Sequence, residues 1–149
     1  MIAVGIFVAM AGGYIVYQII GERGAENLKT AFLRVGNVAL EVEIADDAVS
    51  RARGLSGRAD LEKGRGMLFI FPDARIQHFW MKGMNFPIDI IWIRGGKIAG
   101  AEEGVHPSSG LATPPIYQSP LPVEMVLEVA AGEFNRLNLR PGDSALFVE

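Results

Sequence analysis

Basic side chains stand beside glycines and an aromatic residue at two points of the sequence, and together they could bind an anion. Arg53 and Arg58 flank the segment Gly-Leu-Ser-Gly, and Trp80 comes two positions before Lys82. Arginine forks suit carboxylate, phosphate or sulfate, and neighbouring glycines would leave backbone amides open to such a ligand. We expect Arg53, Arg58, Trp80 and Lys82 to line one depression, with the indole covering the apolar part of the ligand. Solvated surface charge is the alternative for each cation.

Asp89 is the fifth candidate ligand-binding residue. It lies in the segment Ile-Asp-Ile-Ile-Trp-Ile, which is apolar on both alternations and predicts a strand with both faces covered. A carboxylate in such a strand is costly unless it is paired. Arg53, Arg58 and Lys82 are the expected partners, in an ion pair that organises the core. The alternative is a role for Asp89 in binding or catalysis.

Enzyme chemistry has few candidates in this sequence. A hydrolase or lyase could use Asp89 or Glu128 as general base, with Lys82 or Arg53 stabilising an anionic intermediate. The segment Gly-Leu-Ser-Gly lacks the spacing of a nucleophile elbow. The two histidines, His78 and His106, do not have the spacing of a ligand motif, so we expect neither a metal nor a cofactor.

Composition narrows the choice of partners. The chain has 149 residues, a formal net charge of −3 and no cysteine. Its length suggests one domain plus an appendage. Nucleic acid is not an expected partner, because phosphate binding needs clustered Lys and Arg. Thiolate catalysis, disulfides and cysteine-ligated zinc are excluded.

The first 21 residues are predicted to form a single transmembrane anchor. Residues 2–20 carry no charge, and at ~1.5 Å per residue they would give about 28 Å of helix, close to the thickness of a bilayer. A cleaved signal peptide and a buried core helix are the alternatives. Residues 22–30 are predicted to be a tether, and residues 31–149 a separate domain.

The remainder alternates short apolar runs with turn residues, which predicts a mainly antiparallel, β-rich α+β domain, barrel-like or sandwich-like, with one or two short helices. Residues 31–35 and 38–44 form a hairpin around Gly36-Asn37. A short helix capped by Asp46 or Asp47 would end at Gly54. Residues 105–122 read as a long loop, and residues 133–139 as one or two helical turns. Further strands are expected at residues 66–71 (stopped by Pro72-Asp73), 76–82, 88–94, 97–101, 125–129 and 145–148.

Several of these segments together resemble an uncharacterised prokaryotic family, domain of unknown function 192. The most specific are Phe-Trp-Met-Lys, which ends at Lys82, and Pro-Ile-Asp-Ile-Ile-Trp-Ile, which contains Asp89. The family usually has Asn-Thr after the lysine, whereas Gly83-Met84 follow it here, so no role of that polar pair is carried over. The resemblance implies no activity. It suggests an exported or membrane-tethered protein.

The side of the membrane is left open by two conflicting signals. Arg23, Lys29 and Arg34 follow the apolar segment and no basic residue precedes it, which favours a cytoplasmic domain. The family resemblance favours an extracytoplasmic domain, and we adopt that expectation.

Three functions remain compatible with the sequence. The first is a membrane-tethered, non-enzymatic module that binds a small polar or anionic ligand or a cell-envelope partner. The second is the hydrolase or lyase described above. The third is a structural accessory of a membrane complex. A concave pocket containing Arg53, Trp80 and Lys82 would favour the first.

Overall fold

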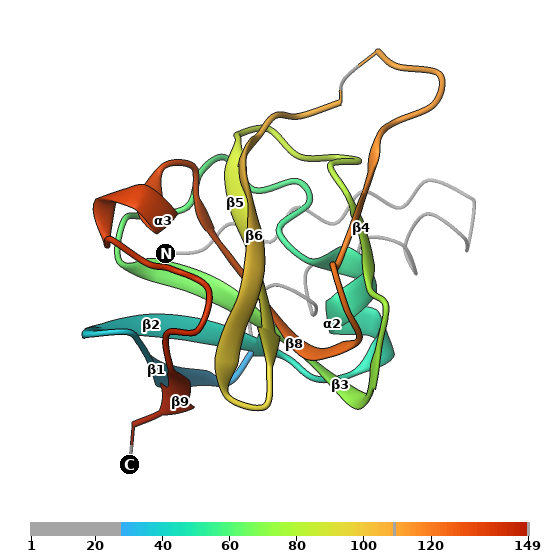
Figure 1. Ribbon diagram of the computed structural model, residues 1–149. Coiled ribbons are helices and arrows are strands. Elements are labelled where there is room, and N and C mark those ends of the chain that lie inside the picture. Colours follow the sequence, from blue (N-terminus) through green and yellow to red (C-terminus); the bar gives the residue numbers. More distant parts are fainter. Residues whose placement is uncertain (1–27, 109, 149) are drawn as a thin grey trace, which may run out of the picture.

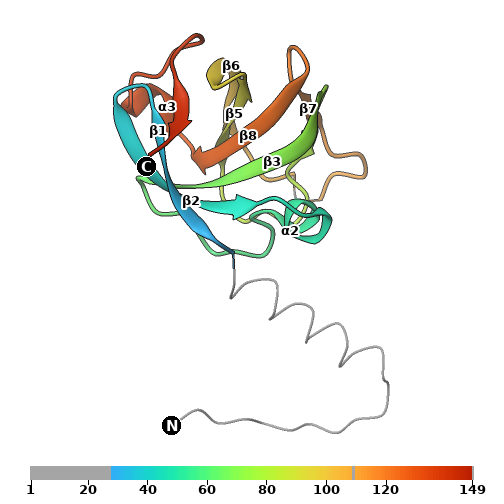
Figure 2. The same cartoon turned by 90° about the horizontal axis from the view of Figure 1, so that it is seen from below.

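A curled seven-stranded sheet forms most of the domain in the computed structural model, which describes residues 28–108 and 110–148. The strand order is β6-β5-β8-β3-β2-β1-β9, and β4 and β7 form a separate two-stranded sheet. Figure 2 shows the large sheet curling into a half-barrel. The strands are β1 (Thr30–Val35), β2 (Val38–Ala45), β3 (Arg65–Arg75), β4 (His78–Trp80), β5 (Ile88–Arg94), β6 (Lys97–Val105), β7 (Ile116–Gln118), β8 (Val123–Ala130) and β9 (Ala145–Phe147).

The pairing of the strands is mainly antiparallel, as the sequence predicts. β1 and β2 form the expected hairpin around Gly36-Asn37. β2 and β3 are parallel, because the helix α2 (Ala48–Arg53) lies between them in the chain and returns it to the same end of the sheet. The two ends of the curled sheet meet where Lys97 bridges Ser144. The β-rich α+β prediction is therefore confirmed, in the form of a half-barrel.

The helix α2 has the capping that the sequence predicts. The Asp47 carboxylate accepts hydrogen bonds from the backbone amides of Val49 at 2.8 Å and Ser50 at 2.9 Å. Gly54 follows the helix with a φ of 52°, which glycine adopts at low cost. A second helix, α3 (Glu133–Arg136), is a single turn. These caps fix both ends of α2, which lies at one side of the half-barrel (Figure 1).

Two apolar clusters cover the two faces of the sheet. The inner cluster lies within the curl and includes Leu68, Ile91 and Leu127. The outer cluster lies on the opposite face and includes Phe69, Ile90 and Val126, with Leu55 and Met84 from segments that cover this face. Since neighbouring residues of β5 belong to different clusters, both faces of this strand are covered, as its sequence predicts.

Several boundaries differ from the sequence prediction, and β6 runs to Val105 where 97–101 was expected. Strand β3 continues past Pro72-Asp73 to Arg75, because the pairing with β8 shifts register between Ile70 and Arg75. An irregularity of this kind accommodates a proline, which has no amide to donate. Strand β4 has three residues where 76–82 were expected, and the expected loop 105–122 contains β7.

The predicted anchor, residues 1–21, and most of the predicted tether lie outside the described residues. Within residues 28–108 and 110–148, no helix is long and apolar enough to cross a membrane.

Candidate functional site

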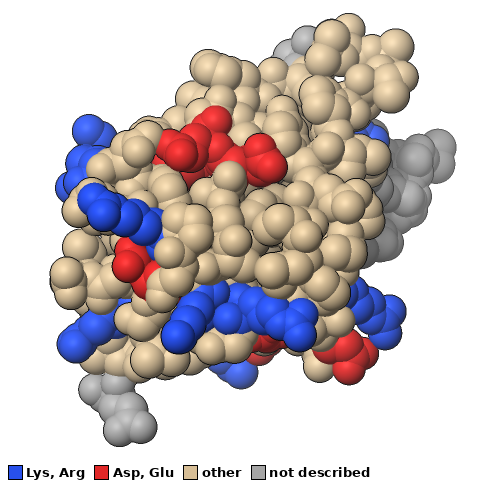
Figure 3. Space-filling model, in the orientation of Figure 1, with Lys and Arg blue, Asp and Glu red and all other residues tan. Residues whose placement is uncertain are grey.

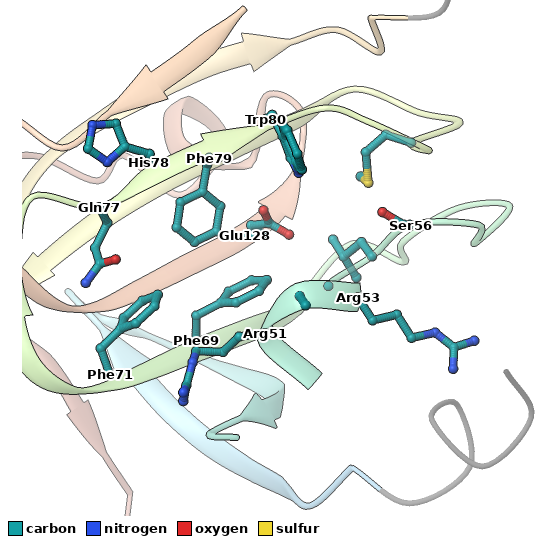
Figure 4. Close-up of a pocket in the computed structure, with 14 residues that line it drawn as sticks. Arg51, Arg53, Ser56, Phe69, Phe71, Gln77, His78, Phe79, Trp80 and Glu128 are labelled. Atoms are coloured by element: carbon teal, nitrogen blue, oxygen red, sulfur yellow. The ribbon is translucent and has the colours of Figure 1, made fainter. Parts of the chain in front are cut away.

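A cavity of about 360 Å³ opens between α2 and β4 (Figure 4). One wall is formed by α2 and the turn after it, residues 51–56, and the opposite wall by residues 77–80. Phe69 and Phe71 of β3 and Glu128 of β8 also line the cavity. Segments that are far apart in the sequence therefore enclose one space, and we name it the Glu128 cavity.

Aromatic rings form much of the wall of the Glu128 cavity. The Phe79 ring meets Phe69 edge-on, with 5.0 Å between centroids and 87° between planes. It meets Phe71 in the same way at 6.5 Å and Trp92 at 5.6 Å. Edge-to-face contacts of this kind hold rings in defined orientations. The wall is therefore apolar and ordered, and suits the flat part of a ligand.

Among the described residues that line this cavity, Glu128 supplies the carboxyl group. Its side chain is 6% exposed, and its strand β8 lies between β3 and β5 in the sheet. Burial raises the pKa of Glu128 from 4.5 to about 8, while the positive charge of Arg58 partly opposes that rise. Among the described residues, none donates a hydrogen bond to this carboxyl group. At neutral pH most molecules therefore carry a protonated Glu128 inside a cavity, which is typical of functional sites.

Arg58 forms its ion pair with Glu43 and not with Glu128. Its guanidinium donates two hydrogen bonds to Glu43, at 2.8 Å and 2.5 Å. These bonds lower the pKa of Glu43 and raise that of Arg58. Arg58 lines two smaller depressions beside the Glu128 cavity and does not line the cavity itself. Its effect on Glu128 is electrostatic.

Arg53 and Trp80 line the Glu128 cavity, whereas Lys82 lines a neighbouring depression together with Trp80. The Arg53 guanidinium points away from Glu128 in Figure 4, and the Lys82 ammonium lies 5.5 Å from the centroid of the Trp80 ring. The turns that carry them are joined, because Ser56 Oγ donates to the Lys82 carbonyl at 2.9 Å and the Gly57 amide donates to the Gly83 carbonyl at 2.9 Å. Of the four residues expected to line one depression, Arg53 and Trp80 line this cavity, and Arg58 and Lys82 line neighbouring depressions.

No cation among the described residues pairs with Asp89, so the predicted ion pair with Arg53, Arg58 or Lys82 was wrong. Its carboxylate is fully buried and accepts hydrogen bonds from the backbone amides of Gly104 at 2.8 Å and Phe134 at 2.9 Å. Gly104 is available because the pairing of β5 with β6 is irregular opposite Asp89. Asp89 lies on the inner-cluster face, where backbone amides take the place of the expected side chain. It does not line the Glu128 cavity.

Glu128 is more prominent in the structure than sequence reasoning suggests. We named it only as an alternative general base, although it lies in the segment Met-Val-Leu-Glu-Val-Ala, as apolar as that around Asp89. Phe69 and Phe71 were expected only as members of an apolar strand. The signal that could have identified Glu128 is a lone acid on a strand with apolar residues on both faces.

Charges of both signs are present on the molecular surface. Figure 3 shows basic and acidic side chains in separate small groups on one face of the protein, with uncharged surface between them. That face has no continuous basic surface of the kind that follows a nucleic-acid backbone.

Comparison with known proteins agrees with the resemblance seen in the sequence. A model of the family described as "Uncharacterized ACR", domain of unknown function 192, matches residues 31–147. No curated protein matches the chain. A solved structure from Sinorhizobium meliloti 1021, named as a proposed transcription regulator, is 32% identical with a TM-score of 0.73, covering 81% of this chain and 95% of its own. A protein of unknown function from Novosphingobium aromaticivorans DSM 12444 is 24% identical with a TM-score of 0.74, covering 81% of this chain and 87% of its own, and shows the fold alone.

Proposed function

This chain belongs to the family called domain of unknown function 192, whose description names no activity, and we propose that it is a membrane-tethered module that binds a small polar or anionic ligand in the Glu128 cavity. The observation that carries the proposal is the buried Glu128 carboxyl, which faces a cavity and accepts no hydrogen bond from the described residues. Within the described residues, the one fully buried polar side-chain atom without a hydrogen-bond partner is Trp92 Nε1, so the Glu128 oxygens are open to the cavity. A ligand in the cavity would supply them with a hydrogen-bond partner.

The size and lining of the cavity support a small ligand. Ligand pockets usually enclose roughly 300–1,000 Å³ and combine apolar walls with a few polar groups. The Glu128 cavity, at about 360 Å³, is near the lower end of that range. Its aromatic walls and single buried carboxyl group match that composition.

The mouth of the cavity favours an anionic or polar ligand over a cation. Arg53 lines the cavity, and Lys82 lies over the ring of Trp80 beside it. Trp80 is 55% exposed, so its indole can cover the apolar part of a ligand. In this proposal Trp80 contacts the ligand directly, Arg53 and Lys82 attract it through their charge, and Arg58 acts on Glu128 through its charge.

The enzyme alternative now rests on Glu128 alone. Asp89 is bonded to two backbone amides on the other face of the sheet and does not line the cavity. With a pKa of about 8, Glu128 would hold a proton at neutral pH and would act first as a general acid. A hydrolase or lyase of this kind would turn over its ligand, which a binding module does not. A structural accessory of a membrane complex would bind no small ligand at all.

The tether is part of the proposal and rests on the uncharged residues 2–20. Leu28, the first described residue, lines a depression together with Arg53 and Arg58. If residues 2–20 span a bilayer, the few residues before Leu28 would hold this side of the domain close to the membrane surface. We place the domain on the extracytoplasmic side. Full-length protein recovered in the soluble fraction without detergent or cleavage would contradict the anchor.

A regulatory role on DNA is not part of the proposal. The Sinorhizobium meliloti relative carries such a name, but a net charge of −3 opposes binding to a phosphate backbone. Fluorescence anisotropy with a labelled duplex at low salt should show no binding.

A thermal-shift screen of small acids, amides and amines on the detergent-solubilised full chain tests the proposal. Ligands should raise the melting temperature of the wild type and of Glu102→Gln, a matched half-buried glutamate that does not line the cavity. They should have no such effect on Glu128→Ala or Trp80→Ala. Failure of every compound to shift the wild type, or equal shifts in all four proteins, would contradict binding in this cavity.

A further inference from the structure

The arrangement of rings and charges in the Glu128 cavity restricts the chemical class of its ligand. We infer that the cavity takes a small planar carboxylate, whose flat part lies against the aromatic wall and whose carboxylate forms a hydrogen bond with the Glu128 carboxyl group. This inference rests on the proposed function and adds the charge and shape of the ligand to it.

The shape follows from the walls. Phe79 is held edge-on by Phe69, Phe71 and Trp92, so these rings are fixed by each other. The cavity has a volume of about 360 Å³, and Trp80 also lines it. A planar ligand can stack on or pack edge-on against such rings, whereas a bulky branched ligand would have to displace them. Figure 4 shows Glu128 between the Phe79 wall and the α2 wall.

The sign of the ligand charge follows from the groups around Glu128. On the α2 side are Arg51 and Arg53, and in the next turn is Arg58. Arg51 is held by the carbonyls of Asp46 and Ile70, at 2.6 Å and 2.8 Å.

The β4 side adds His78, and the β3 side of the cavity contributes only the rings of Phe69 and Phe71. Glu43 does not line the cavity, and its carboxylate accepts two hydrogen bonds from Arg58. Among the described residues, Glu128 is thus the single acid that lines the cavity, together with two arginines, and Arg58 is the cation whose charge acts on the Glu128 carboxyl. An added negative charge is therefore favoured over a positive one.

The protonation state of Glu128 makes the contact with a carboxylate favourable. A neutral carboxyl group donates one O–H hydrogen bond, and donation to an ionised oxygen is among the stronger hydrogen bonds. Burial raises the pKa of Glu128 to about 8, so the donor is present at neutral pH. A cationic ligand would instead require Glu128 to lose its proton on binding.

Three nearly isosteric probes test the inference: benzoate, benzamide and benzamidine, which carry negative, zero and positive charge on the same ring. Binding is measured by isothermal titration calorimetry on the full chain in detergent, from pH 6 to pH 9.5. Benzoate should bind most tightly and benzamidine most weakly, by at least tenfold. The affinity for benzoate should be flat below pH 8 and fall about tenfold per pH unit above it, as Glu128 loses its proton.

Glu128→Gln distinguishes an anionic from a cationic ligand. A glutamine amide still donates a hydrogen bond to a carboxylate but cannot form an ion pair with a cation. This variant should bind benzoate within about threefold of the wild type and lose the dependence on pH above 8. Glu102→Gln should retain both the affinity and the pH dependence. His78→Gln should also retain the decline above pH 8, which assigns that decline to Glu128. Thermal melts confirm that each variant is folded.

Three outcomes would overturn the inference. Tightest binding of benzamidine, with loss of that binding in Glu128→Gln, would identify a cation site. Binding of all three probes with equal affinity would show that only the rings contribute. Failure of all three probes, while other compounds in the thermal-shift screen bind, would reject a planar carboxylate and leave the proposed function standing.

Discussion

Two buried carboxyl groups lie on adjacent strands of this sheet and have opposite surroundings. Asp89 on β5 pairs in register with Val129, and its neighbour Ile90 pairs with Glu128 on β8. Asp89 faces the inner cluster and accepts two backbone hydrogen bonds. Glu128 faces the outer side, lines a cavity and has no hydrogen bond from the described residues. The two side chains are buried to nearly the same extent, but hydrogen-bond donors from the described residues reach Asp89 and not Glu128.

The comparison separates structural from functional acids. A buried carboxylate with two amide donors is satisfied by the fold and stabilises it. A buried carboxyl group that faces a cavity without a partner costs the fold free energy and is available to a ligand. The sequence patterns around the two residues are similar, so the distinction becomes visible only when the donors are located.

The largest effect is expected from Asp89→Ala. The substitution leaves the buried amides of Gly104 and Phe134 without an acceptor, and it should lower the free energy of unfolding by about 3 kcal/mol or more. Urea unfolding monitored by circular dichroism measures the change. Asp60→Ala, in an exposed turn, is the control and should change stability by less than about 0.5 kcal/mol. An equally small loss for Asp89→Ala would remove the contrast between the two acids.

Glu128→Gln should raise the free energy of unfolding at neutral pH, whereas Asp89→Ala lowers it. An unfolded chain releases the Glu128 proton near pH 4.5, whereas the folded protein keeps it until about pH 8. This contribution to stability is therefore full below about pH 4.5 and is lost as the pH rises through 8.

At pH 7 the glutamine variant should be more stable than the wild type by up to about 3 kcal/mol, and its stability should vary less between pH 5 and pH 8. Urea unfolding across this range measures both, with Glu102→Gln as control. Destabilisation at pH 7 together with an unchanged pH profile would mean that Glu128 has a stabilising partner.

Arg58→Ala should produce a smaller loss and sharpen the comparison. The pair with Glu43 is about 30% exposed on both sides, so its loss should cost roughly 1 kcal/mol. The variant also removes the positive charge that lowers the pKa of Glu128, so that pKa should rise further. Arg65→Ala, which breaks the more exposed pair with Glu41, should leave the pKa of Glu128 unchanged. Equal effects of the two variants on Glu128 would contradict the assigned electrostatic contact.

Much of the fold is encoded locally, and that part could be predicted from the sequence. The hairpin around Gly36-Asn37 and the helix between Asp47 and Gly54 depend on residues that are neighbours in the chain. The extension of β3 past Pro72 could not be predicted, because it depends on a register shift against a strand about fifty residues away.

The candidate site was predictable only in part for the same reason. The burial of Asp89 follows from its own strand, but its partners are backbone amides of β6 and α3, which leave no mark in the residue types. The burial of Glu128 could have been inferred from its segment. Its exposure to a cavity could not, because the cavity is made by α2 and β4 coming together on the outer face.

The pKa of Glu128 is the most direct test of the account. Nuclear magnetic resonance of the protein labelled with ¹³C at the glutamate carboxyl groups, titrated from pH 4 to pH 10, follows each group separately, and the resonance absent from Glu128→Gln identifies this one. We predict a midpoint at about pH 8 for Glu128, which moves upward when benzoate is bound, since the ligand requires the protonated carboxyl group. A midpoint between about 4 and 5, typical of a solvated glutamate, would show that the group is neither buried without a partner nor held ready for a ligand.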